Sequence, residues 1–92
     1  MNLTRVIFRK HKKGGGIIAF LPDAEVNYGN IMAYEHIGQH GEASYGYYLE
    51  ETVKADDDEY RDLLNELSFI YTDGLQVLVR LSHRLLSKSW SK

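Results

Sequence analysis

The stretch DDDEYRDLLNELSFIYTDG, residues 56–74, decides the fold because it carries the signals of one complete amphipathic helix. Asp56 is a good N-cap, and Glu59 three residues later completes a capping-box pattern. The apolar residues that follow recur at spacings of three and four, which is one stripe on a helix. The stripe consists of Tyr60, Leu63, Leu64, Leu67 and Ile70 or Tyr71. Gly74 favours a helix end, so the pattern predicts a helix over residues 57–71.

Outward from this helix, the sequence favours extended structure. Residues 2–10 and 75–81 alternate in character, and glycines at 14–16 allow the first of these stretches to turn back into a hairpin partner at 17–21. Further strands are expected at 31–36 and, after a glycine-punctuated loop, near 44–50.

These elements predict an α+β fold with a mostly antiparallel sheet of four or five strands and one helix packed on one face. Residues 1–84 are expected to form a single domain, with residues 85–92 as a C-terminal tail. An uncovered second sheet face, a thin core and seven tyrosines predict a homodimer.

Composition excludes several classes of protein. The 92-residue chain has no cysteine, so it has no disulfide framework and no thiolate metal site. Its start lacks the apolar core of a signal peptide, and no apolar run reaches the roughly 18 residues that cross a bilayer. We expect a cytoplasmic protein that does not contact a membrane and needs no cofactor.

Charge is sorted along the chain, although the net charge is only −2. Residues 1–22 carry +5, residues 23–73 carry −11 and residues 74–92 carry +4. The basic ends are a candidate nucleic-acid surface. Its residues are Arg9, Lys10, Lys12, Lys13, Arg80 and Arg84. The alternative is a solvated hairpin tip whose lysines keep other chains from pairing with a sheet edge.

A second candidate surface is polar and aromatic. It consists of Tyr34, His36, Gln39, His40 and Tyr45. Donors, acceptors and flat rings on a glycine-hinged loop are typical of ligand or partner contacts. The alternative is that these rings border a thin core with their polar tips hydrogen-bonded. His36 and His40 lie about 13 Å apart on an extended strand, which disfavours a shared metal ion.

Two segments carry a family resemblance: IIAFLP at 17–22 and MAYEHIGQHG at 32–41, the latter followed by Tyr45. With the Tyr60 helix and the last strand, they resemble a family of small uncharacterised proteins of bacteriophages, plasmids and conjugative elements. The family shares a Tyr-x-His-x-Gly-Gln-His segment, here Tyr34 to His40. The resemblance covers most of residues 4–81 and implies a mobile-element origin without a known activity. Residues 85–92 depart from the family's pattern.

The chain shows no complete catalytic set, since no serine, threonine or lysine lies in a recognisable nucleophile setting. The sequence therefore predicts a non-catalytic accessory protein of a mobile element. It is expected to bind a host protein or a small ligand through residues 34–45. Nucleic-acid binding through the basic ends is the alternative.

Overall fold

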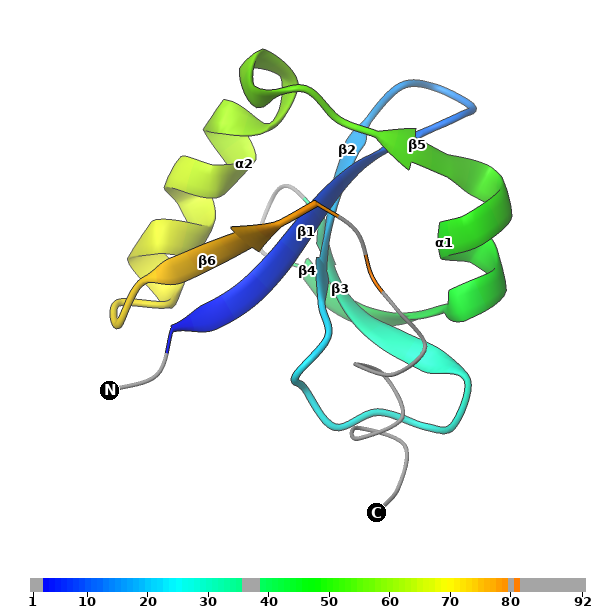
Figure 1. The fold of residues 1–92 in the computed structure, drawn as a ribbon, viewed down its shortest axis with the longest axis horizontal. Helices are drawn as coiled ribbons and strands as arrows, with labels where there is room; N and C mark the ends of the chain where they lie inside the picture. The colour runs from blue at the N-terminus through cyan, green and yellow to red at the C-terminus, as the bar shows by residue number, and fades with distance from the viewer. Residues whose placement is uncertain (1–2, 36–38, 80, 82–92) are drawn as a thin grey trace.

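The computed structural model describes residues 3–35, 39–79 and 81. In that part of the chain, six strands form one sheet and a helix lies on each of its faces, as Figure 1 shows with α2 on one side and α1 on the other. The strands are β1 (Thr4–His11), β2 (Ile17–Leu21), β3 (Asn30–Glu35), β4 (Gln39–Ser44), β5 (Thr52–Lys54) and β6 (Leu75–Leu78). The helices are α1 (Tyr45–Glu51) and α2 (Asp57–Ile70).

The sheet has the order β4-β3-β2-β1-β5, and β6 also pairs with β1. β5 pairs with the end of β1, from Arg9 to His11, while β6 pairs with its start, from Thr4 to Ile7. The β1–β6 pairing is parallel and the other pairings are antiparallel. The predicted α+β class with a mostly antiparallel sheet is confirmed.

Helix α2 forms where the sequence predicts it. Glu59 Oε1 accepts the backbone N–H of Asp56 at 2.9 Å, which is the return arm of the predicted capping box. Leu63 and Leu67 are buried against the sheet. The helix ends at Ile70, and Gly74 then adopts a φ of +106°, a conformation that glycine takes without steric cost.

The α2 face of the sheet holds the first of two core clusters. Phe8 stacks on Tyr60 of the helix, with ring centroids 4.4 Å apart. The register aligns Phe8, Ala19, Tyr34 and His40 in one row across four strands, so the row runs from the covered centre to the sheet edge. The cluster consists of Val6, Phe8, Ala19, Leu21, Tyr34, Ala55, Leu63 and Leu67.

Helix α1 corrects the prediction of a loop followed by a strand near 44–50. Residues 39–44 form β4, and the tyrosine-rich segment after it is helical. Ser44 is the N-cap, and its Oγ accepts the Tyr47 N–H at 2.9 Å. Tyr48 is 3% exposed and packs edge-on against Phe20. This tertiary packing overrides the strand preference of the tyrosines.

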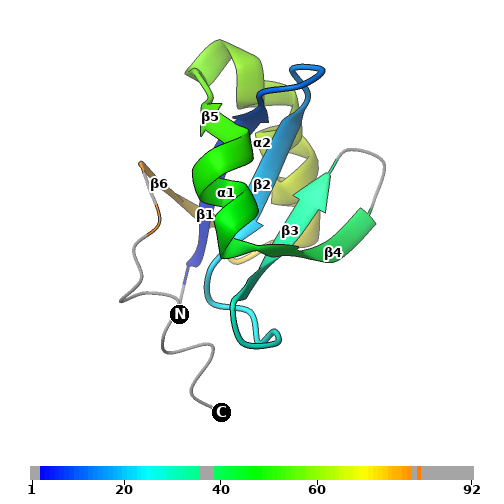
Figure 2. The ribbon, with the colours of Figure 1, turned by 90° about the vertical axis from the view of Figure 1, so that its right-hand side faces the viewer.

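Helix α1 also corrects the expectation of an uncovered second face. Figure 2 shows α1 in front of the sheet and α2 behind it. Beneath α1 lies a second core cluster of Ile7, Ile18, Phe20, Ile31, Ala33, Tyr48 and Leu81. The homodimer thus loses this part of its support and stays a prediction.

Other boundaries differ in detail. β1 extends to His11, and β6 ends at Leu78 rather than at residue 81. The proposed domain boundary at residue 84 and the tail at 85–92 lie outside the described residues. Within the part that is described, neither helix has the length and apolar character needed to span a membrane.

Candidate binding site beside helix α2

One side of α2 meets three strands in succession along its length. Its first turns lie beside the start of β2, its middle meets β3, and the residue after its end contacts β4. We call this surface the α2 flank. It consists of Ile17, Tyr34, His40, Glu59, Asp62, Leu63, Glu66 and Tyr71.

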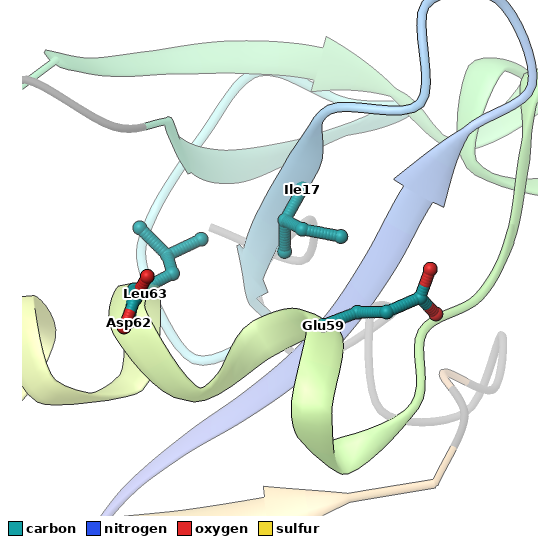
Figure 3. Close-up of a pocket in the computed structure, with 4 residues that line it drawn as sticks. All are labelled: Ile17, Glu59, Asp62 and Leu63. Carbon is teal, nitrogen blue, oxygen red and sulfur yellow. The ribbon is translucent and has the colours of Figure 1, made fainter.

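The first part of the α2 flank is a hollow of about 250 Å³ lined by Ile17, Glu59, Asp62 and Leu63. Figure 3 shows Glu59 and Asp62 at opposite ends, with Ile17 of β2 between them. The helix period produces this arrangement, because residues three apart lie on one side of a helix. The hollow therefore combines an apolar wall with two carboxylates.

Glu59 is held in place by two contacts. Its Oε1 accepts the Asp56 N–H, and its Oε2 accepts from Lys10 Nζ at 2.5 Å. The backbone hydrogen bond first and the Lys10 hydrogen bond second lower the pKa of Glu59. The same ion pair raises the pKa of Lys10. The Glu59 carboxylate is thus held in place in the lining of the hollow, and its charge is balanced by Lys10.

Asp62 differs from Glu59. Its side chain is exposed, and within the described residues it forms no ion pair. A carboxylate in this position attracts a cation, and the attraction grows where part of the surrounding water is displaced. The Asp62 carboxylate can therefore attract a cationic group of a ligand.

The far part of the α2 flank is aromatic. The buried Tyr34 donates its hydroxyl hydrogen bond to Glu66 Oε2. The ring of His40 lies edge-on to that of Tyr34 at 4.7 Å, and His40 Nε2 lies 3.0 Å from the Tyr71 hydroxyl. Burial raises the pKa of Tyr71, so its hydroxyl stays protonated well above neutral pH. Toward the sheet edge, the α2 flank therefore consists of aromatic rings and the carboxylate of Glu66.

The protein-family models, the curated proteins and the solved structures that were compared with this chain contain no match. The resemblance to mobile-element proteins thus stays a prediction.

The structure brings only part of the predicted patch together. Tyr34 and His40 adjoin on the α2 face, with Tyr34 inside the core and His40 exposed. Tyr45 lies in α1, stacked on Tyr48 over the opposite face. His36 and the side chain of Gln39 lie outside the described residues. The predicted patch is therefore split between two faces of the sheet.

The predicted basic surface is also divided. The Arg9 guanidinium lies 4.6 Å above the Tyr48 ring and donates to the Thr52 carbonyl at the end of α1. Lys10 pairs with Glu59. Lys12 and Lys13 are exposed in the turn that follows β1. Arg80 and Arg84 lie outside the described residues.

The sequence reasoning missed Asp62, Glu66 and Tyr71 as site residues. The spacing of Glu59, Asp62 and Glu66 is three and four, so a helical projection of the predicted helix places them on one side. That projection was available from the sequence, but the partner strands were not. Among the described residues, no group of three histidine, cysteine or acidic side chains is arranged to hold a metal ion.

Proposed function

We propose that the α2 flank of this protein is a non-catalytic binding site that receives a basic segment of a partner protein. The carrying observation is the exposed carboxylate of Asp62 on a hollow whose wall includes Ile17 and Leu63. Lysine and arginine lay their aliphatic stems on apolar surface and keep their charged ends at carboxylates and in water. The hollow supplies both features.

Size favours a side chain over a small molecule. Pockets for drug-sized ligands measure about 300–1,000 Å³ and are largely enclosed. The hollow is smaller, at about 250 Å³, and is bounded by one helix and the start of one strand. A single arginine or lysine of a longer segment fits it, and neighbouring residues of that segment would reach Glu66 and His40.

Titration with labelled peptides tests the proposal. We expect a lysine- and arginine-rich peptide to bind the intact protein, and a glutamate-rich peptide of equal length to show no binding. Asp62→Lys should weaken binding about tenfold or more, because it replaces attraction by repulsion at the hollow.

The matched control is Asp58→Lys, which makes the same charge change on the same helix at a side chain that is 94% exposed. We expect it to weaken binding no more than about twofold, since exposed charges are screened by salt. An equal loss of peptide affinity in the two variants would show that net charge alone governs binding. It would contradict a binding site at the hollow.

The setting of this binding rests on the resemblance. The resemblance to small proteins of mobile elements supports the proposal of an accessory protein that acts on a host protein in the cytoplasm. A basic partner also agrees with the −11 charge of residues 23–73.

Nucleic-acid binding is the second candidate, and the exposure of Lys12 and Lys13 at the hairpin tip favours it. Since Arg9 and Lys10 already have protein partners, the described part of this surface is small. Salt-dependent binding to DNA or RNA that is lost in a Lys12→Glu, Lys13→Glu variant would support it.

A homodimer remains a further proposal. Val53, Val77 and Val79, in and next to the strands that flank β1, are 39%, 41% and 71% exposed. Exposed apolar side chains at a strand edge favour pairing with a second chain. Light scattering that shows only monomer at tens of micromolar protein would remove the proposal.

A further inference from the structure

A chain of three polar side chains lies on the α1 side of the sheet, away from the α2 flank. His11 comes from the end of β1, Glu35 from the end of β3, and Tyr47 from the first turn of α1. His11 Nε2 lies 2.6 Å from Glu35 Oε1, and His11 Nδ1 lies 2.7 Å from the Tyr47 hydroxyl. The order is carboxylate, imidazole, hydroxyl.

The contacts fix the direction of each hydrogen bond when His11 is neutral. An ionised carboxylate only accepts, so His11 Nε2 carries the proton and donates it to Glu35. Nδ1 then presents its lone pair, and the Tyr47 O–H donates to it. Glu35 thereby orients a base that is already hydrogen-bonded to a hydroxyl, which is the arrangement of an activated nucleophile.

Space for a reactant lies beside Glu35. A hollow of about 150 Å³ at that position is lined by Ile18, Ala33, Glu35, His40, Gly41, Glu42 and Ala43. Among the described residues other than the chain neighbours of Gly41, no atom lies within 4 Å of the position that a Cβ on Gly41 would take. Tyr47 is 36% exposed and Glu35 is 55% exposed, which leaves the chain accessible.

We propose that Tyr47 is a nucleophile for acyl groups carried on a good leaving group, with His11 as its general base and Glu35 as the residue that positions His11. A neutral carbonyl group suits this site because the carboxylate of Glu35 repels a phosphate. The inference goes beyond the binding function of the α2 flank, because His11, Glu35 and Tyr47 do not belong to that flank.

The reaction with N-acetylimidazole, a simple acyl donor, illustrates the step. The Tyr47 oxygen attacks the carbonyl carbon while its proton passes to His11 Nδ1. The bond between the acetyl carbon and the imidazole nitrogen then breaks, and His11 returns the proton to the departing imidazole. The products are O-acetyl-Tyr47 and free imidazole, and no other reactant is needed.

Peptide mapping by mass spectrometry after brief treatment of the intact protein tests the proposal. Tyr28, which is 80% exposed, is the internal reference. We expect Tyr47 to be acetylated about tenfold faster than Tyr28 despite its lower exposure. A positioned general base raises the rate about a hundredfold or more in complete active sites, so about tenfold is a modest expectation for this site. His11→Gln should bring Tyr47 to or below the rate of Tyr28 and leave Tyr28 unchanged. Faster reaction at Tyr28 in the unaltered protein, or an undiminished Tyr47 rate in His11→Gln, would overturn the proposal.

The role of Glu35 has a readout that is independent of folding energy. Nitrogen-15 NMR of the unaltered protein should show His11 with its proton on Nε2, and Glu35→Ala should give a mixture of the two neutral tautomers. A proton on Nδ1 in the unaltered protein would contradict the proposed direction of the chain, whether or not the His11 variant folds.

Discussion

The two helices of this protein lie on opposite faces of one sheet and are specified in different ways. Helix α2 has 14 residues, a capping-box glutamate and an apolar stripe, all of which are local features. Helix α1 has only 7 residues and, apart from the Ser44 cap, relies on contacts with distant segments. Isolated helices this short are marginal in water, so tertiary contacts must supply the stability of α1.

The contacts of α1 converge on Tyr48. Its ring packs on Phe20 and under the Arg9 guanidinium, and its hydroxyl accepts the backbone N–H of Leu81 at 2.9 Å. At the end of α1, the Thr52 hydroxyl donates to the Tyr48 carbonyl at 2.6 Å. β1, β2 and the segment after β6 therefore all hold this helix in place.

Tyr48→Ala is expected to have the largest effect. Removing a buried aromatic ring costs about 3–5 kcal/mol in the free energy of unfolding, a large share of the stability of a small domain. Urea denaturation measures it, and hydrogen exchange should show protection lost at residues 45–51 first. A loss below about 1 kcal/mol in the free energy of unfolding would mean that α1 is locally stabilised. It would contradict the difference between the two helices.

Ser44→Ala probes the one local signal of α1. Loss of an N-cap side chain costs about 1 kcal/mol. We expect urea denaturation to show this smaller loss, and hydrogen exchange to place it in α1 without change in α2. An effect as large as that of Tyr48→Ala would show that the cap, and not the core contact, stabilises α1.

Acidification probes the local contacts of α2. The folded pKa of Glu59 is lowered from its ordinary value of 4.5 by Asp56 and Lys10, so its contribution is present above that value. The contribution is lost as the pH falls through the lower folded pKa, where the carboxyl is protonated in both states. Urea denaturation from neutral pH to about pH 3 should therefore show a shallower loss of stability for Glu59→Gln than for the unaltered protein. Identical slopes would contradict the role of Glu59 in holding the start of α2.

This difference explains what the sequence could predict. The bounds of α2 follow from Asp56, Glu59 and the leucine spacing. The first hairpin follows from the glycines after β1, and the structure confirms a positive φ at Gly14 and Gly15. Helix α1 was missed because tyrosines favour strands in isolation and because its partner Phe20 lies 28 positions away. The same holds for both candidate sites: Asp62 and Tyr47 gain their meaning from Ile17 and His11, and only the pairing of the strands brings these neighbours close.

The location of bound basic peptide tests the central claim most directly. In two-dimensional NMR of the labelled intact protein, a lysine- and arginine-rich peptide is predicted to shift the amide signals of Ile17, Asp62, Leu63 and Glu66 most strongly. The signals of α1 should stay in place. Shifts concentrated in the 45–51 segment or spread evenly over all acidic residues would contradict the assignment of the α2 flank as the binding surface.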